Sequence, residues 1–438
     1  MSIFDDSLYE VVSSIEALVF SNKIKSVTII RDLWGRIRIA IEYVDNNLPL
    51  TEDEKNQLNI ILHGKLKEYW LSVIWEEKRR DPAFESFKKT MYNLRILWQP
   101  PESQSTIKWY RLERRFSKQS WLEANRFSPI WEFDGEANSN ETAIVSFYSF
   151  KGGVGRSTAL AAVALLLADA GKDVFVLDLD LESPGIGNVL IQEENSKDGI
   201  LDYLIDVQVL KKRPNLSSYV YMLPVGRKLV KVIGAGSLNG EFIEKLGRID
   251  FGSYLDVENA LDSKKNENPL KILLSHIREE YHPDFILMDV RAGFHDLGGL
   301  SLNSLSHLDV IFARNDSQSL MGLKVLLRLL GGQKKGKELF VVQAQVPPPS
   351  RGVGQYDAEN HELFRSKVFD IMGEYYYLDD QPDIADDTAP YGLPLPFSFE
   401  LQRGITLSDL LVVYKEDRYN FEKLAKMIGI YLSKETIE

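Results

Sequence analysis

A glycine-rich run, Phe150-Lys-Gly-Gly-Val-Gly-Arg-Ser-Thr158, joins an apolar segment predicted to be a strand to one predicted to be a helix. Its three glycines let the backbone curl so that successive N–H groups face one anion, and the following helix adds the positive end of its dipole. The Ser157 hydroxyl is a suitable ligand for Mg²⁺. The run therefore predicts a phosphate-binding loop for Mg²⁺-ATP, although the loop alone also suits GTP. The residues expected to bind the nucleotide are Lys151, Gly152, Gly153, Val154, Gly155, Arg156, Ser157 and Thr158.

Two apolar segments that end in carboxylates are the expected partners of the metal and the water. Val174-Phe-Val-Leu-Asp-Leu-Asp180 ends in two aspartates, which share one side if the strand continues through them. Phe285-Ile-Leu-Met-Asp289 is a second such segment. Carboxyl ends of parallel strands meet at one edge of an open α/β sheet, where ligands bind. Asp178, Asp180 and Asp289 are therefore expected beside the phosphate loop, and the alternative for the first two is that they only cap a loop.

The strict pattern G-x-x-x-x-G-K-[ST] is not met, because Phe150 replaces its first glycine and Arg156 its lysine. The run resembles the deviant Walker A motif K-G-G-x-G-K-[ST] of ParA/MinD-type ATPases, and most closely a subgroup with K-G-G-V-G-R. The resemblance implies that Lys151 contacts the nucleotide phosphates of the partner subunit in a sandwich dimer. Arg156 stands at the second lysine; its planar guanidinium can hold phosphate charge, but differs from a lysine point charge.

The two acidic segments also resemble motifs of this family. The first resembles its switch-I, or Walker A′, run, which implies that Asp178 lies near the metal-water shell and Asp180 orients the attacking water; Glu182 is a second candidate. The other resembles the Walker B strand, so that Asp289 would hold Mg²⁺ through water, with Ser157 as a direct ligand. Lys151, Arg156 and Asp180 are the expected catalytic residues.

Three further positions are weaker matches to the family. Family members often have Asp-x-Pro where this chain has Asp-Val-Arg291, so Arg291 is either a phosphate or subunit contact or a surface ion-pair residue. Asn315 follows a predicted strand and is a candidate for binding adenine. Gln343 and Gln345 occupy the second base-binding position, where the family has asparagine.

Beyond residue 141 the predicted elements alternate between strands and helices. This alternation predicts an α/β fold: a mostly parallel P-loop NTPase sheet covered by helices on both faces. The expected strands are 143–150, 173–179, 285–289, 309–314 and 339–345, and the expected helices are 157–170, 270–280, 317–330, 361–372 and 419–433. The aromatic run Tyr375-Tyr-Tyr377 is interpreted as a further strand.

Residues 1–135 differ in pattern and predict a small α+β module of sensor or partner-binding role. A helix at 5–20 precedes two strands at 27–31 and 36–44, and Thr51-Glu-Asp-Glu54 predicts a capping box at the next helix. A polar stretch, 134–142, is the expected linker. The chain is thus expected to hold two domains, 1–135 and 141–438, and the ParA/MinD resemblance covers about residues 141–434.

Composition excludes several classes of protein. The chain of 438 residues has no cysteine, which excludes disulfides, thiolate nucleophiles and cysteine-ligated iron–sulfur clusters. A net charge of −12 disfavours nucleic acid as the main partner. No apolar run is long enough to span a bilayer, and the acidic N-terminus is unlike a signal or transit peptide. A cytoplasmic protein without membrane attachment is expected.

These observations predict an ATPase, converting ATP and water to ADP and phosphate, that acts as a nucleotide-dependent homodimeric switch and controls a partner protein through residues 1–135. The resemblance also suggests a role in bacterial immunity, that is, antiviral defence. Two alternatives are a nucleotide-sensing scaffold with little turnover and a DNA-partition ATPase.

Overall fold

The chain forms two compact units, Met1–Ser117 and Lys118–Glu438, which are described separately below. The computed structural model describes residues 3–77, 82–101, 103, 105–115, 117–122, 141–191, 198–210, 212–226, 228–249, 268–331, 338–349, 356–377, 381–398, 406–408, 410–411 and 418–436. Positions 134–140 of the expected linker lie outside these residues, so the boundaries at 135 and 141 stay predictions.

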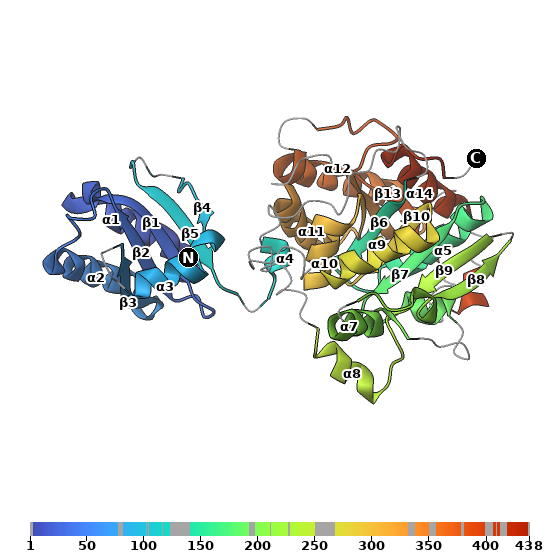
Figure 1. Ribbon diagram of the computed structural model, residues 1–438. Helices are drawn as coiled ribbons and strands as arrows, with labels where there is room; N and C mark the ends of the chain where they lie inside the picture. Colours follow the sequence, from blue (N-terminus) through green and yellow to red (C-terminus); the bar gives the residue numbers. More distant parts are fainter. Residues whose placement is uncertain are drawn as a thin grey trace. The chain divides into compact units, whose positions relative to one another are not determined.

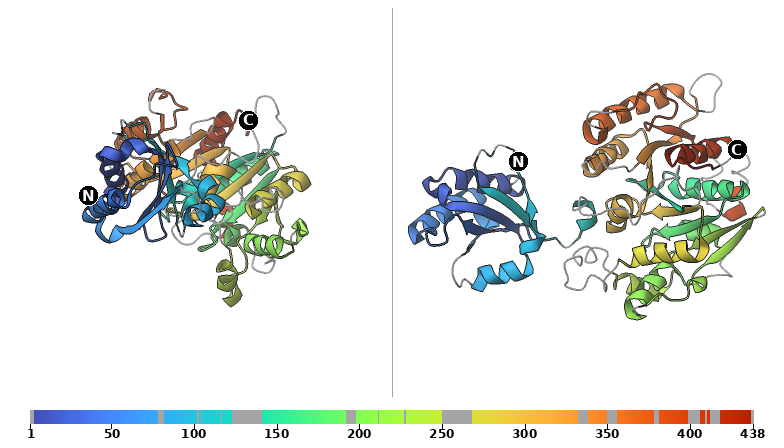
Figure 2. Two further views of the ribbon diagram at one scale, coloured as in Figure 1. Left: turned by 60° about the vertical axis from the view of Figure 1, so that its left-hand side comes forward. Right: turned by 45° about the horizontal axis from the view of Figure 1, so that its top comes forward.

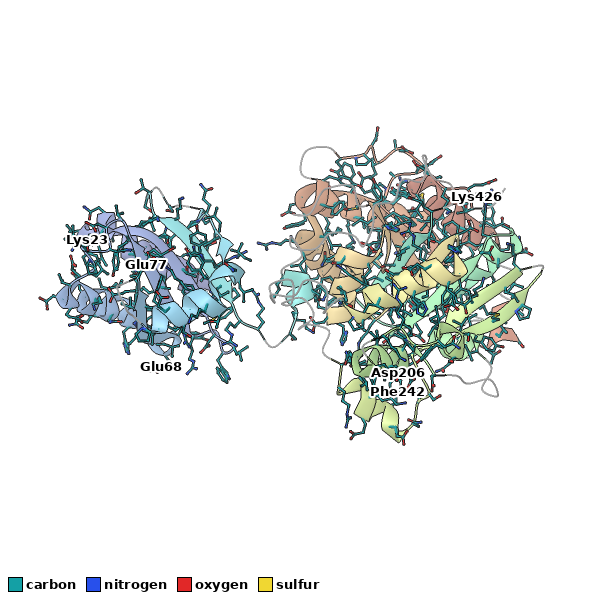
Figure 3. The ribbon with its side chains drawn as sticks, in the orientation of Figure 1. Lys23, Glu68, Glu77, Asp206, Phe242 and Lys426 are labelled. Carbon is teal, nitrogen blue, oxygen red and sulfur yellow. The ribbon has the colours of Figure 1, made fainter. Side chains whose placement is uncertain are left out.

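The first unit is a five-stranded mixed sheet with helices on both faces, in the order β3-β2-β1-β5-β4. Apolar side chains of two helices, α1 and α2, pack on one face and those of α3 on the other. The side chain of Thr51 accepts from Glu54 N–H and the Glu54 side chain accepts in return, which confirms the predicted capping box. Lys23, labelled in Figure 3, donates to both oxygens of Glu54. The elements are α1 Ile3–Glu16, β1 Ile24–Arg31, β2 Ile37–Tyr43, α2 Glu52–Leu66, β3 Trp70–Glu76, α3 Pro82–Thr90, β4 Ile96–Leu97 and β5 Lys108–Glu113, with 3₁₀ turns at Val19–Lys23, Lys67–Tyr69 and Tyr92–Leu94.

The second unit contains an eight-stranded sheet in the order β13-β12-β11-β6-β10-β7-β9-β8 (Figure 1). All its pairings are parallel except that of β8 with β9. The strands are β6 Ala143–Ser149, β7 Val174–Leu179, β8 Tyr221–Val225, β9 Lys228–Ile233, β10 Phe285–Val290, β11 Leu308–Ala313, β12 Glu338–Val346 and β13 Leu393–Pro396. The central strands are buried on both faces, as continuous apolar runs predict for a parallel sheet.

Helices cover both faces of this sheet, which confirms the predicted fold class. One face packs against α5, α6 and α14; the other packs against α7, α9, α10, α11 and α12 (Figure 1). α5 and α14 lie side by side although about 260 positions separate them in sequence (Figure 2). Phe242, labelled in Figure 3, anchors α8 in the core. The helices are α4 Gln119–Leu122, α5 Arg156–Asp169, α6 Ile186–Leu190, α7 Ile200–Leu210, α8 Gly240–Leu246, α9 Pro269–Tyr281, α10 Asp296–Leu300, α11 Ser317–Leu330, α12 Ala358–Met372 and α14 Arg418–Tyr431, with a 3₁₀ turn at Leu216–Ser218 and π-helical turns at Ser301–Leu305 and Gly373–Tyr377.

One predicted element is wrong. The run of three tyrosines lies in the π-helical turn Gly373–Tyr377 and not in a strand, because it continues directly from α12. Tyr376 and Tyr377 nevertheless pack against the apolar core of the unit. Within the described residues, no helix has both the length and the apolar character needed to cross a bilayer.

Candidate functional site

The glycine-rich loop follows the central strand β6 and leads into α5, as predicted. Gly153 and Gly155 adopt φ values of 72° and 85°, a left-handed region that glycine occupies without strain. A Cβ atom added to Gly152, Gly153 or Gly155 would meet no atom within 4 Å, so the loop borders open space. The loop is therefore shaped for an anion to approach its backbone N–H groups at the start of a helix.

A cavity of about 620 Å³ opens on this loop. It is lined by Ser149, the loop from Gly152 to Thr158, Asp180, Ser183, Ala292, Gln345, Leu395, Pro396, Phe397, Ser398, Asn420 and Phe421. The volume lies within the range of small-molecule sites, roughly 300–1,000 Å³. Its lining joins the polar phosphate loop to apolar residues from β13 and α14, so it suits a ligand with an anionic part and an apolar part.

Arg156 is buried and points toward carboxylates. Its Nε donates to Asp289 Oδ1 at 2.6 Å, and its Nη2 lies 3.2 Å from Asp180 Oδ2 and 3.4 Å from Ser157 Oγ. Burial alone would lower the pKa of Arg156, but the negative charges of Asp289 and Asp180 outweigh it and raise that pKa above its ordinary value. The side chain thus neutralises two of the three predicted acidic site residues.

Asp178 and Asp289 stand opposite each other on the neighbouring strands β7 and β10, and both are completely buried. Asp178 Oδ1 accepts from Asp180 N–H, while its Oδ2 accepts from the N–H groups of Gly185 at 3.2 Å and Gly187 at 2.9 Å. Burial, together with the charge of Asp289, raises the pKa of Asp178 to about 7. Asp178 therefore caps the loop after β7 in this structure, which was the alternative to a metal role. Its place in a metal-water shell stays a prediction.

Ser157 and Asp289 have the chemistry that a Mg²⁺ site needs. Asp289 Oδ2 is buried and accepts no hydrogen bond from the described residues, although Ser157 and Arg156 adjoin the same carboxyl group. Nowhere in the described part of the chain do three or more histidine or acidic residues gather as a metal site. Mg²⁺ characteristically takes one or two protein ligands together with substrate phosphates and water. Ser157 and Asp289 suit such a shared site, and Asp180 lies at the cavity wall beside them.

The other predicted residues lie at different distances from the cavity. Lys151 is partly exposed, with its Nζ 3.9 Å from Asp316 Oδ2. Asn315 is not among the cavity residues: its amide donates to Asn360 O at 3.1 Å and accepts from Lys367 Nζ at 3.0 Å. The turn after β11 therefore directs this predicted adenine ligand toward α12.

The two glutamines of β12 differ in the same way. Gln343 is buried and bonded to Asn360 and His361, away from the cavity. Gln345 lines the cavity, and its Nε2 donates to Gly153 O at 2.8 Å. Its φ of 54° and a register shift between Ala344 and Val346 turn the side chain toward the loop.

Sequence reasoning missed the cavity wall outside the phosphate loop and the ion-pair partner His295. The wall from Leu395 to Ser398 and from Asn420 to Phe421 comes from β13 and α14, which carried no motif. Glu182 forms ion pairs with Arg291 and, at 2.8 Å, with His295, so Arg291 serves as an ion-pair residue here. The acidic segment after β7 is thereby tied to the segment after β10.

Part of this unit matches a known family model. Residues 140–247 match the family model described as ParA, NUBPL iron-transfer P-loop NTPase. This confirms the predicted ParA/MinD type of P-loop NTPase for the segment, whereas the K-G-G-V-G-R subgroup stays a prediction. No curated protein matches the chain.

Three solved structures illustrate the similarity in the course of the chain. A ParA family ATPase from Chlorobium tepidum TLS has 16% identity and a TM-score of 0.44 over 67% of this chain and 98% of its own. The septum site-determining protein MinD from Pyrococcus horikoshii OT3, complexed with Mg-ADP, has 18% identity and a TM-score of 0.43 over 66% and 98%. The cell division ATPase MinD of Pyrococcus furiosus has 22% identity and a TM-score of 0.42 over 66% and 98%.

Proposed function

We propose that the chain binds Mg²⁺-ATP at Lys151–Thr158 and hydrolyses it as a molecular switch. The observation that carries this proposal is the glycine loop itself, which opens on a cavity that Asp180 also lines. Triphosphate at the loop would place the base toward the apolar wall formed by Leu395, Pro396 and Phe421. The family-model match over residues 140–247 supports the same chemistry.

The roles follow from the position of each group. Backbone N–H groups of the loop bind the phosphates, while Ser157 and Asp289 hold Mg²⁺, which neutralises phosphate charge when bound. Asp180, at the cavity wall, orients the attacking water, and the reaction gives ADP and phosphate. Arg156 would add its positive charge to the binding of the phosphates.

The proposal includes a nucleotide-dependent homodimer. Lys151 is the residue expected to reach the second subunit, and its side chain is 36% exposed at the edge of the loop. Control of a partner protein through residues 1–135, in a bacterial immunity module, belongs to the same proposal.

A second candidate is a nucleotide sensor with little turnover. The observation in its favour is the pairing of Arg156 with Asp289 and Asp180, which occupies the groups needed for hydrolysis. In that case nucleotide binding, without hydrolysis, would switch the chain between two conformations.

Turnover and binding assays on the same preparations separate the two candidates. We would measure Mg²⁺-ATP binding, with GTP as competitor, and multiple-turnover hydrolysis by the parent chain and by Asp180→Ala. Asp387→Ala is the matched control, because Asp387 is an exposed aspartate of the same unit. Turnover lost only in Asp180→Ala supports the ATPase. Binding without turnover supports the sensor, and the absence of binding overturns both.

A further inference from the structure

The segment from Lys118 to Leu122 packs against the start of α10. α10 is the next helix after strand β10, which carries Asp289. Lys118 N–H donates to Asp296 Oδ1 at 2.6 Å, and Ser120 Oγ donates to Asp296 O at 2.8 Å. The indole N–H of Trp121 donates to His295 O at 2.7 Å. Ser120 Oγ also lies 3.3 Å from Asp296 Oδ1, so four hydrogen bonds join this short segment to two consecutive residues.

The segment can approach α10 closely because two residues of this helix, Gly298 and Gly299, have no side chain. A Cβ atom on Gly299 would lie 2.4 Å from Ser120 Oγ, and one on Gly298 would lie 3.0 Å from the Trp121 ring. Trp121 is only 2% exposed, and Lys118 adopts a φ of 72°, which is unfavourable for lysine. The segment is therefore fitted to α10 by specific geometry rather than by general apolar packing.

An aromatic chain leads from this segment to the phosphate loop. The Trp121 ring packs edge-on against Phe294 with centroids 5.2 Å apart, and Phe294 packs against Phe150 at 5.3 Å. Phe150 immediately precedes Lys151. Gly293 N–H also donates to Ser149 O at 3.1 Å. The loop held by Trp121 is thus in direct contact with both residues that introduce the phosphate loop.

A polar connection leads from the same loop to the other side of the site. His295 Nδ1 accepts from Leu297 N–H, so its Nε2 carries the proton and donates to Glu182 Oε1 at 2.8 Å. Glu182 lies two residues beyond Asp180, and its other ion-pair partner, Arg291, lies two residues beyond Asp289. His295 therefore makes both contacts: its carbonyl accepts from Trp121, and its ring binds Glu182 in the segment after β7.

We propose that Lys118–Leu122 is a positioning element of the nucleotide site. It holds the loop Ala292–Asp296, and through Phe294 and His295 this loop fixes the entry to the phosphate loop and the segment after Asp180. Docking of Lys118–Leu122 and nucleotide binding then change each other's free energy, since such coupling is reciprocal. The segment directly follows Ser117, the last residue of the first unit. A change in its docking on nucleotide binding would therefore act on the chain at the boundary of that unit. This inference rests on the proposed nucleotide binding.

Hydrogen–deuterium exchange of the full chain tests the inference, with and without Mg²⁺ and the slowly hydrolysed analogue AMP-PNP. Peptides from the phosphate loop report binding, and peptides covering 118–122 and 293–300 report docking. We expect slower exchange in all three regions. Protection of the phosphate loop alone would overturn this inference and leave nucleotide binding intact. No change at the phosphate loop would overturn the proposed function, and this inference with it.

Two conservative variants test the reciprocal effect. Trp121→Phe keeps a ring but removes the N–H donor, and Asp296→Asn keeps the side-chain size but weakens the acceptor of Lys118 N–H. Each is expected to weaken AMP-PNP binding by about threefold to tenfold. Trp34→Phe is the matched control, because Trp34 is exposed and lies in the first unit. Unchanged affinity in both variants would show that the segment only packs against the unit and does not position its site.

Discussion

The guanidinium of Arg156 lies against the carboxylate of Asp289, with Nε 2.6 Å from Oδ1. A second contact joins it to Asp180. In this arrangement the Arg156 guanidinium pairs with two carboxylates, and one of them, Asp180, lines the cavity. Mg²⁺ beside Asp289 would bring a second cation to the same carboxylate. We therefore expect bound Mg²⁺ to weaken the ion pair between Arg156 and Asp289.

Arg156→Ala is expected to destabilise the nucleotide-free chain by about 3 kcal/mol, because it leaves buried carboxylates without their partner. Arg156→Lys should cost less, since lysine keeps the charge but not the forked geometry that spans two acids. Thermal unfolding of the three proteins measures the difference. Equal unfolding temperatures for the parent and Arg156→Ala would show that the ion pair contributes nothing to the nucleotide-free state.

Stability should fall as the pH rises from about 4 to 7, in part because of Asp178. Its pKa is raised to about 7 in the folded chain, so the folded state keeps a proton that the unfolded state has released above its ordinary pKa of 3.8. The stabilisation is full below that ordinary value and lost as the pH rises through 7. The slope is at most about 1.4 kcal/mol per pH unit.

Asp178→Asn should flatten this decline, because asparagine does not titrate. Urea unfolding midpoints at several pH values between 4 and 7.5 would be compared with those of the exposed control Asp387→Asn. Burial also raises the pKa of Asp289, so this residue makes stability fall with rising pH in the same way. Both variants retain that contribution. Parallel curves for Asp178→Asn and the parent would contradict the assignment of the shift to Asp178.

The sequence was sufficient to predict the central strands and the elements that follow them. Long β-branched and apolar runs end at Ser149, Leu179 and Val290, and the glycines after the first run require a turn. These features are local, so they can be recognised without knowledge of distant contacts. The acids at the ends of β7 and β10 meet because the strands are parallel neighbours.

The remaining parts of the site depend on contacts between distant residues. β13 contains Pro394 and Pro396, which lack an N–H donor, so its composition argued against a strand; it pairs only with β12, at the sheet edge. The partner of Arg156 lies 133 positions away at Asp289, and Asn315 bonds to groups 45 and 52 positions away. No spacing in the sequence reports such pairings.

Gln345 combines a strained backbone with a contact to the phosphate loop. Gln345→Ala keeps φ positive and loses the hydrogen bond to Gly153, whereas Gln345→Gly loses the same bond but relieves the strain. We expect the glycine variant to be more stable by about 1 kcal/mol, and both to bind nucleotide more weakly than the parent. Thermal unfolding and AMP-PNP titration measure the two effects. Equal stability of the variants would mean that position 345 carries no backbone strain.

Gly322, on α11, controls the position of Phe150 at the entry to the phosphate loop. A Cβ atom there would lie 2.1 Å from the Phe150 ring, so Gly322→Ala must displace the residue that precedes Lys151. We expect a loss of about 1–3 kcal/mol in the free energy of unfolding, together with weaker nucleotide binding.

The control is Gly64→Ala, in the last turn of α2, where an added Cβ meets nothing within 4 Å. That substitution should stabilise the chain by about 0.5–1 kcal/mol, because alanine favours a helix more than glycine does. The backbone effect favours alanine at both positions, so a loss of stability in Gly322→Ala alone reports the collision with Phe150. If Gly322→Ala were as stable as Gly64→Ala and bound AMP-PNP like the parent, Phe150 would be free to move without disturbing the loop.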